Sequence, residues 1–337
     1  HLYVKYIDIN FSGKKAEILY KGEPIDTRYD CLFIKGSFRY AQLLRAVSAL
    51  YAVQKDVYLA YDSSAYTIAH DKLLTQLVLQ QKNLPMPKTY LSATVEAAKV
   101  VLSKINYPII MKFPQGTQGK GVMFADSYAS ASSILDALDA LNQPFLVQEY
   151  IETNSSDVRL LVVGDEVVAA MRRKGKGVDK RANIHAGGVG EAFIPDVVMK
   201  RMAIEASRAI GADVCGVDIL EGPMGPMIIE LNISPGLQGI TAATKIDIAD
   251  KIAKYLHEKT SELHENKKAK ETKEIMAELD ATSKEGKAND QELITHLDFR
   301  GTRILLPDLV SKITGLKDTD SVQLVAGKGK VEIKKFM

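Results

Sequence analysis

A pair of apolar segments joined by a tight turn constrains the fold of this chain most strongly. Between residues 216 and 239, the turn signal Gly222-Pro223-Met224-Gly225 separates two apolar runs, a pattern typical of a β-hairpin. Glu230 and Asn232 lie two residues apart on the second strand and therefore project from the same face. They alternate with apolar residues that we expect to point into a core, namely Ile229, Leu231 and Ile233.

The first strand of this hairpin adds a second carboxylate. Asp218 is predicted to lie opposite Glu230, with the register defined to within one residue. Together with Asn232, it places two carboxylates and an amide oxygen on one sheet face. Such a set suits Mg²⁺ shared with substrate phosphates better than it suits zinc. A solvated polar face on a half-exposed hairpin is the alternative interpretation of these residues.

Composition narrows the class of protein. A chain of 337 residues is long enough for more than one compact domain, and a net charge of +2 does not by itself indicate a nucleic-acid or membrane partner. The sequence contains only two cysteines, Cys31 and Cys215, which lie far apart and match no metal-ligand spacing. A disulfide framework is therefore not expected, and the reducing cytoplasm is favoured. Charged residues interrupt the apolar runs, so we expect neither a membrane-spanning segment nor a signal peptide.

Short strands alternate with helices at the start of the chain. Residues 1–87 are therefore predicted to form a small α/β domain, which includes one helix over residues 69–82. The sequence Leu84-Pro-Met-Pro87 disfavours helix and predicts an extended boundary.

The rest of the chain divides into three further parts. Residues 88–256 are predicted to form a larger α/β (α+β) domain, with lobes of about residues 88–151 and 152–256. The Lys- and Glu-rich residues 257–291 predict an exposed helix or a flexible tether. Strand character returns in residues 292–337, which predict a small β-rich module.

A glycine-rich loop at residues 115–121 lies between two predicted strands. Gly116, Gly119 and Gly121 allow backbone N–H groups to approach an anion without obstruction by a Cβ atom. Because the loop lies between two strands, it is neither the dinucleotide-binding fingerprint nor a P-loop, both of which join a strand to a helix. A glycine-rich hairpin of this kind can still fold over nucleotide phosphates. An ordinary hairpin turn is the alternative.

Two lysines are candidates for phosphate binding. Lys112 ends an otherwise apolar strand, where its charge needs an anionic partner, either a phosphate or a structural carboxylate. Lys72 lies on the predicted helix 69–82, where a simple surface charge is the alternative.

A polar segment closes the next apolar strand. Glu149 offers an acceptor, and Tyr150 and Ile151 offer an apolar wall, as a pocket for a nucleotide base requires. An ordinary edge strand is the alternative. Asp157 is placed to accept a hydrogen bond from a ribose hydroxyl or to cap a turn.

Basic residues lead from a predicted buried strand into a loop. Arg172 and Arg173 precede this loop, and Arg181, Asn183 and His185 lie within it. Basic side chains on such a loop can stabilise the charge on a transferred phosphoryl group, and a solvated basic loop is the equal alternative. The sequence shows neither the pattern of a Ser/His/Asp or Cys/His nucleophile nor the spacing of a zinc site.

In this order, these pieces resemble the ATP-grasp ligases, and among them the ribosomal protein S6 modification (RimK-like) family, which ligates glutamate to carboxyl groups. The resemblance covers about residues 60–256. The matching stretches are His70-Asp-Lys-Leu, Gln115-Gly-Thr-Gln-Gly-Lys-Gly121, Val147-Gln-Glu-Tyr-Ile151, Asp157-Val-Arg159, Gly164-Asp-Glu-Val-Val-Ala-Ala170, Arg181-Ala-Asn-Ile-His-Ala-Gly-Gly188, Gly216-Val-Asp218, Glu230-Leu-Asn-Ile-Ser-Pro-Gly-Leu-Gln-Gly239 and Lys245-Ile-Asp-Ile-Ala249.

The resemblance implies an ATP-grasp fold and three groups of site residues. Those that bind ATP would be Lys72, Lys112, Gly116, Gly119, Lys120, Gly121, Glu149, Tyr150, Ile151, Asp157 and Arg181. Those that hold Mg²⁺, or Mn²⁺ in its place, would be Asp218, Glu230 and Asn232. The catalytic group would comprise Arg173 and Asn183 beside the γ-phosphate and Arg159 near the acceptor.

The reaction that this family implies proceeds through an acyl phosphate. ATP phosphorylates a carboxylate, and an amine then attacks the activated carbonyl to give an amide, ADP and phosphate. The implied enzyme is an ATP-dependent carboxylate–amine ligase that adds glutamate to a carboxyl acceptor. Ala186 replaces an expected basic residue, which bears on the acceptor. The alternatives are ligation of a different amino acid to a metabolite or carrier protein, and a nucleotide-sensing, DNA-associated regulator.

The C-terminal module resembles a second family. Residues 297–307, a short helix, residues 315–320 and two strands are similar to the AbrB-type swapped-hairpin fold, whose members dimerise and often bind DNA. A module of this size buries too little surface to be stable alone, so we expect a homo-oligomer formed through residues 292–337. Its basic residues are offset by acidic ones, which makes DNA the less favoured partner.

Overall fold

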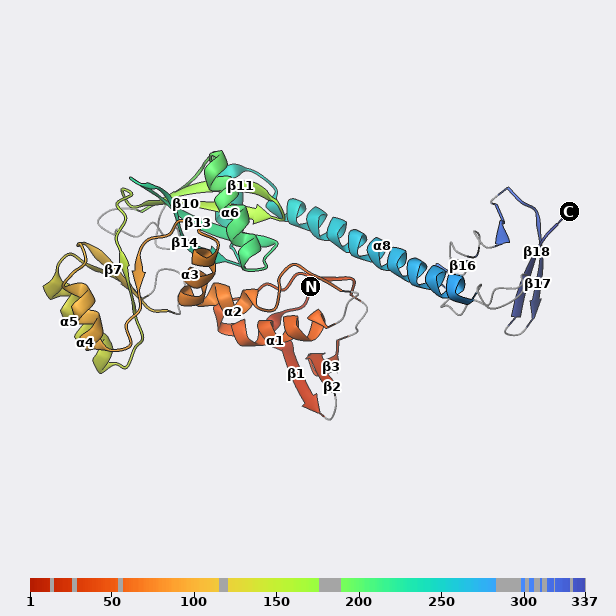
Figure 1. The fold of residues 1–337 in the computed structure, drawn as a ribbon, viewed down its shortest axis with the longest axis horizontal. Helices are drawn as coiled ribbons and strands as arrows, with labels where there is room; N and C mark the ends of the chain where they lie inside the picture. The colour runs from red at the N-terminus through yellow and green to blue at the C-terminus, as the bar shows by residue number, and fades with distance from the viewer. Residues whose placement is uncertain are drawn as a thin grey trace. The chain divides into compact units, whose positions relative to one another are not determined.

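The computed structural model divides into two compact units, His1–Leu263 and His264–Met337 (Figure 1). The structure describes residues 1–12, 15–25, 29–53, 57–114, 121–175, 189–282, 298–300, 303–305, 310, 314–317, 319–327 and 330–336. Mixed strands and helices make up the first unit, as predicted for an α/β chain.

The first unit opens with a small antiparallel sheet, a parallel strand pair and three helices. The sheet comprises β1 (Ile7–Ser12), β2 (Lys15–Tyr20) and β3 (Glu23–Pro24), in that order. The parallel pair comprises β4 (Cys31–Leu32) and β5 (Tyr58–Leu59). The helices are α1 (Ala41–Ala52), α2 (Ala65–His70) and α3 (Lys72–Gln81), with 3₁₀ turns at Val4–Tyr6 and Phe38–Tyr40.

The single helix predicted over residues 69–82 is wrong, because the structure contains two helices there. Asp71 separates α2 from α3 with an extended backbone, φ −120° and ψ 113°. Its side chain accepts hydrogen bonds from the backbone N–H groups of Leu73 and Leu74, and so forms the N-cap of α3.

A four-stranded sheet and two helices form the next lobe. The sheet runs in the order β6 (Thr89–Tyr90), β9 (Leu146–Glu149), β7 (Ile109–Lys112) and β8 (Val122–Ala125). The two helices are α4 (Val95–Leu102) and α5 (Tyr128–Ala140). The apolar sides of both helices and of β7 share one core, which includes Leu102, Met111 and Leu135. The predicted glycine-rich hairpin therefore joins two paired strands, with Lys112 opposite Val122.

A five-stranded antiparallel sheet organises the second lobe. Its order is β12 (Val189–Ala192), β11 (Glu166–Lys174), β10 (Ser156–Val163), β13 (Val214–Gly222) and β14 (Gly225–Asn232). Helix α6 (Val197–Ala209) lies between β12 and β13 in the chain, and α7 (Gln238–Thr244) follows β14. The largest core packs α6 against this sheet and extends to the helices α2 and α3.

The predicted hairpin of β13 and β14 is present, with Gly222 opposite Gly225 at its turn and Asp218 opposite Glu230. One predicted core residue is wrong. The register shifts next to Asp218, so Ile219 pairs with Ile228, and Ile229 is left without a partner in the ladder. The bulge brings Ile228, together with Leu231, into the core in place of Ile229.

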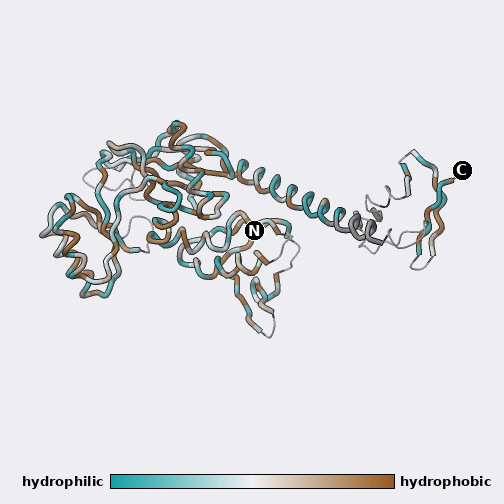
Figure 2. The backbone as a smooth tube through the Cα atoms, viewed as in Figure 1, coloured by the Kyte–Doolittle hydropathy of each residue, from teal (hydrophilic) through white to brown (hydrophobic). Residues whose placement is uncertain are grey.

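The charged segment that follows the second lobe is helical over much of its length. Helix α8 (Ile248–Thr282) begins on the core with Ile248 and Ile252 and continues into the Lys- and Glu-rich sequence. Hydrophilic residues recur along it (Figure 2). None of the helices in the described part of the chain has the length and apolar character needed to span a membrane.

The described residues of the second unit include two short hairpins. One pairs β15 (Asp298–Arg300) with β16 (Arg303–Leu305), and the other pairs β17 (Val322–Gly327) with β18 (Lys330–Lys335). The assignment of residues 292–337 to a separate β-rich module stays a prediction. The AbrB-type resemblance itself stays a prediction.

Candidate active site

Charged side chains follow one face of the five-stranded sheet across four strands. Side chains two residues apart on a strand share a face, so Asp157 and Arg159 of β10 point to the same side. The strand register then places Arg173 of β11 opposite Asp157, and Asp218 of β13 opposite Arg159. Glu230 of β14 lies opposite Asp218 on the other side. The sheet order thus assembles residues from both ends of the lobe into one acid–base row.

Direct ion pairs connect the first members of this row. Arg159 donates from Nε and Nη2 to the two carboxylate oxygens of Asp218, both at 2.7 Å. Arg173 donates from Nε to Oδ1 of Asp157 at 2.6 Å, and its Nη2 lies 2.8 Å from Oδ2 of Asp218. Because Asp157, Arg173 and Asp218 are all buried, removing any one of them would leave an uncompensated charge in the protein interior.

The surroundings separate the pKa values of the acids in this row. Burial alone would raise the pKa of Asp218, but Arg159 and Arg173 outweigh it and hold that pKa at about 2. Burial raises the pKa of Asp157 to about 6, against the opposing charge of Arg173. Burial and the negative charge of Asp218 also raise the pKa of Glu230. Asp218 is therefore ionised, whereas Asp157 and Glu230 sit where additional positive charge would be stabilising.

Positive charge from other elements acts on Glu230. Lys72, Lys112 and Arg159 each oppose the rise in its pKa. Within the described ranges, we find no hydrogen bond or ion pair to the Glu230 carboxylate. Its oxygens therefore remain available in a strongly cationic environment.

Lys112 has a polar partner, but not the anionic one that its sequence environment predicts. Its Nζ donates to Oε1 of Gln148 at 2.6 Å, and Nε2 of Gln148 donates to the hydroxyl of Thr89 at 2.8 Å. Burial lowers the pKa of Lys112 to about 8, a shift that Glu230 opposes and Lys72 reinforces. A neutral amide oxygen compensates a lysine charge only in part, so an added anion here would be stabilising.

Lys72 owes its position to the helix break at Asp71. It is the first residue of α3, and its backbone N–H donates to the carbonyl of Pro114, just before the glycine-rich loop, at 3.1 Å. Burial lowers the pKa of Lys72, opposed by Glu230 and Asp71. Lys72, Lys112 and Glu230 therefore influence one another's charge and form one cluster. Two lysines that bind the same phosphates would have to lie close together in this way.

Only the last residue of the predicted phosphate loop lies within the described residues. Gly121 has φ +75°, and a Cβ atom at this position would lie 2.1 Å from Cδ2 of Phe113. Both the backbone conformation and the contact require glycine. The predicted positions outside the described residues are Gly116, Gly119, Lys120, Arg181 and Asn183.

The predicted base-binding segment connects the two lobes. The carboxylate of Glu149 accepts from the backbone N–H of Lys88 at 2.8 Å. Tyr150 meets the ring of Phe124 edge-on, with centroids 5.3 Å apart. Ile151 packs against Gly222, where a Cβ atom would lie 2.7 Å from Cγ2 of Ile151. These contacts place Ile151 beside the turn of the hairpin that carries Asp218 and Glu230.

The donor set at the hairpin is chemically suited to Mg²⁺. Asp218, Glu230 and Asn232 supply only oxygen atoms, and a cation beside Glu230 would offset the burial that raises its pKa. Asn232 already uses Oδ1 to accept from the backbone N–H of Ser234 at 2.9 Å. Among the described residues, no three His, Cys, Asp or Glu side chains gather as a metal site.

Two neighbours of the site escaped the sequence reasoning. Gln148 holds Lys112, and Lys35 donates from Nζ to the backbone carbonyl of Pro235, just beyond Asn232, at 2.5 Å. A signal for Lys35 was available, because it follows β4 of the parallel pair, and ligands of α/β sheets bind beyond the carboxyl ends of parallel strands.

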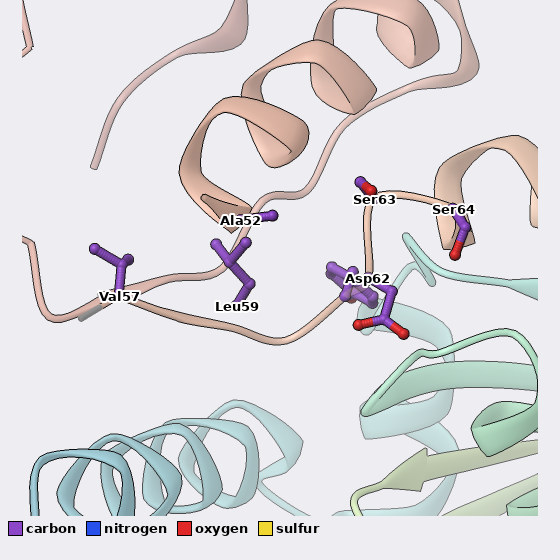
Figure 3. Close-up of a pocket in the computed structure, with 7 residues that line it drawn as sticks. Ala52, Val57, Leu59, Asp62, Ser63 and Ser64 are labelled. Atoms are coloured by element: carbon purple, nitrogen blue, oxygen red, sulfur yellow. The ribbon is translucent and has the colours of Figure 1, made fainter. Parts of the chain in front are cut away.

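A separate pocket lies in the N-terminal part (Figure 3). It has a volume of about 420 Å³ and is lined by Ala52, Val57, Leu59, Tyr61, Asp62, Ser63 and Ser64. None of these residues belongs to the acid–base row or to the lysine cluster, so the pocket does not mark the candidate site.

Sequence comparisons agree with this geometry. Residues 69–256 match the family described as "RimK-like ATP-grasp domain". The chain is 35% identical over 264 residues to a "Probable alpha-L-glutamate ligase 1" of Pseudoalteromonas atlantica, covering 78% of this chain and 86% of that protein. It is 36% identical over 255 residues to a "Probable alpha-L-glutamate ligase" of Cellvibrio japonicus, covering 75% and 83%.

Structural comparison supports the same fold. The ATP-grasp ligase PsnB, solved with a minimal precursor, superposes with a TM-score of 0.59 at 19% identity, covering 75% of this chain and 86% of PsnB. A second PsnB structure, complexed with minimal precursor, Mg and ADP, superposes with a TM-score of 0.57, also at 19% identity, over 77% of this chain and 87% of PsnB. At this level of identity, the likeness concerns the fold alone.

Proposed function

Since this chain belongs to the RimK-like ATP-grasp family and is an ATP-dependent carboxylate–amine ligase, we propose that it joins glutamate to the carboxyl group of an acceptor. Relatives that cover most of the chain are named probable alpha-L-glutamate ligases. The observation that carries the proposal is the acid–base row, in which Glu230 lies opposite Asp218 and within the field of Lys72 and Lys112.

The described residues suit the first half of such a reaction. Lys72 and Lys112 would hold the phosphates of ATP, because burial lowers the pKa of both lysines and a bound phosphate would stabilise their charged forms. Asp218, Glu230 and Asn232 would hold Mg²⁺, with Mn²⁺ as an alternative. When bound, the metal supplies charge neutralisation between the phosphate oxygens.

Arg159 and Arg173 would orient the carboxylate that receives the phosphoryl group. Asp218 and Asp157 fix both guanidinium groups by paired hydrogen bonds. A fixed guanidinium costs little reorganisation when charge develops beside it. The resulting acyl phosphate reacts with the amine of the second substrate, which forms the amide and expels phosphate. Adenine contact by Glu149, Tyr150 and Ile151 and ribose contact by Asp157 belong to the same proposal.

The test is a screen for amino-acid-dependent ADP release, with mass spectrometry of candidate acceptors. We expect release to require glutamate and an acceptor, and the acceptor to gain one glutamyl residue. Release with another amino acid, but not with glutamate, would overturn the choice of glutamate while leaving the ligase chemistry intact.

A matched pair of variants tests the metal assignment. Glu230→Gln should lower turnover by about a hundredfold or more, because the amide removes the charge that would hold the metal against the phosphates. The control is Glu166→Gln, an exposed carboxylate at the start of β11 of the same sheet. A folded Glu230→Gln enzyme that turns over as fast as this control would contradict the assignment.

We also propose that residues 292–337 form a homo-oligomer, as the AbrB-type resemblance implies. In β17 and β18, the apolar side chains of Leu324, Val325 and Val331 are exposed. A lone two-stranded hairpin is only marginally stable in water, so a second copy is the partner that would bury these residues. The two free cysteines, Cys31 and Cys215, are consistent with the cytoplasm as the proposed location.

A further inference from the structure

A segment of the N-terminal part reaches the loop beyond the candidate metal ligands. Lys35 and Gly36 come shortly after β4, the first strand of the parallel pair. Nζ of Lys35 donates to the carbonyl of Pro235 at 2.5 Å, and the backbone N–H of Gly36 donates to Oγ of Ser234 at 3.0 Å. Two hydrogen bonds between segments some two hundred residues apart therefore hold Lys35 against this loop.

The loop that Lys35 contacts, which contains Ser234 and Pro235, follows β14, the strand that carries Glu230 of the acid–base row. The backbone N–H of Ser234 donates to Oδ1 of Asn232 at 2.9 Å. A Cβ atom at Gly216 would lie 3.1 Å from Cβ of Pro235 and 3.8 Å from Cδ of Arg159. Pro235 and Arg159 therefore lie close together at Gly216, and Lys35 contacts Pro235 on this loop.

The ammonium group of Lys35 is available for a ligand. It has three N–H donors, of which the contact with Pro235 uses one. The residue is exposed, and no carboxylate forms an ion pair with it in the part of the chain that the structure describes. Its charge is therefore held in a fixed position without a compensating anion. A fixed, uncompensated cation at the edge of a site favours an anionic ligand.

We propose that Lys35 binds a substrate carboxylate that takes no part in the reaction. The inference depends on the proposed function, because the reacting carboxylate must lie beside the phosphates near Lys72 and Lys112. Glutamate keeps both of its carboxylates when its amine reacts, and a peptide acceptor can carry further ones. Lys35 contacts the loop that follows Asn232, where such a spectator carboxylate would extend. The hydroxyl of Ser234 supplies a second donor beside it.

The test compares two variants of Lys35 in the full-length enzyme. Lys35→Gln removes the charge but keeps an N–H donor that can reach the carbonyl of Pro235, and Lys35→Arg restores the charge. The matched control is Lys104→Gln, an exposed lysine of the other lobe. The KM for ATP, for the amino acid identified by the screen and for the acceptor are measured separately, together with the melting temperature.

We expect Lys35→Gln to raise one substrate KM by about 10- to 100-fold, the effect of losing a charge-assisted hydrogen bond. The KM for ATP and the melting temperature should stay at the values of the Lys104→Gln control, and Lys35→Arg should recover most of the loss. An increase in the KM for the amino acid assigns the carboxylate to that substrate, and an increase in the KM for the acceptor assigns it to the acceptor.

Other outcomes overturn the inference. A lower melting temperature with both substrate KM values unchanged would mean that Lys35 only ties the loop to the N-terminal part. Equal KM values in Lys35→Gln and the control would refute the inference about Lys35 but leave the proposed function intact. A wild-type enzyme that ligates no amino acid would overturn the proposed function together with it.

Discussion

The two buried aspartates of the candidate site each have an arginine beside them, whereas Lys112 has the neutral amide of Gln148 as its partner. Asp218 accepts from both Arg159 and Arg173, and Asp157 from Arg173. Pairing of this kind offsets the several kcal/mol that burying a single charge would cost. Glu230, which we find without a hydrogen bond among the described residues, is the member of the row best placed to receive a cation.

The lowered pKa of Lys112 predicts how ATP affinity depends on pH. Burial lowers its pKa from 10.5 to about 8, and the charged form is the one that binds phosphate. ATP affinity should therefore fall as the pH rises above about 8, because binding then requires uptake of a proton. Calorimetry between pH 7 and 9, in buffers of different ionisation enthalpy, measures this uptake.

Substitution of Lys112 gives a second measurement. Lys112→Met should weaken ATP binding by about 1.5–3 kcal/mol, the contribution of a hydrogen bond to a charged group, and should abolish the dependence on pH. Lys104→Met, on the surface of the same lobe, serves as the control. Equal ATP affinity in Lys112→Met and the control would mean that Lys112 only supports Gln148.

The helix break between α2 and α3 determines the position of Lys72 in the candidate site. A continuous helix through Asp71 would move Lys72 out of register with the glycine-rich loop, because its backbone contact with Pro114 would be lost. Asp71 prevents this by accepting from Leu73 at 2.8 Å and from Leu74 at 3.1 Å. An N-cap thus determines where a candidate phosphate ligand lies.

Removal of this cap is expected to affect both stability and binding. Asp71→Ala should lower the free energy of unfolding by about 1 kcal/mol and weaken ATP binding, whereas Asp71→Asn should keep both close to wild type, because asparagine caps as well as aspartate. Urea unfolding and ATP titration of the two variants test this expectation. If Asp71→Asn were as damaged as Asp71→Ala, the charge of Asp71 rather than its capping would be responsible.

The two units have different sources of stability. The first has a large core that extends from the N-terminal helices to the beginning of α8. In the second, one leucine and three valines of β17 and β18 are exposed, namely Val322, Leu324, Val325 and Val331. We therefore expect the first unit to fold by itself and the second to need a partner.

A truncation separates these properties. A chain ending at Leu263, the boundary of the first unit, should be monomeric and should keep ATP-dependent ligase activity, whereas the full-length chain should be at least a dimer. Light scattering measures the mass of both forms. An unchanged oligomer in the truncated chain would refute oligomerisation through residues 292–337.

Local sequence patterns determined those features that depend on neighbouring residues. Alternation along β14 and the turn at residues 222–225 were enough to predict the hairpin and the pairing of Asp218 with Glu230. The break at Asp71 was also within reach, because aspartate is a strong N-cap residue and lies directly before the apolar run of α3.

Only the tertiary structure decided which side chains pair across the site. The contacts of Arg159 with Asp218, of Lys112 with Gln148 and of Lys35 with Pro235 join residues far apart in the chain. They depend on the order of strands in each sheet and on the packing of the N-terminal part, which no local periodicity encodes. The bulge at Ile229 belongs with them, because a shift of one residue depends on how both strands pack against the core.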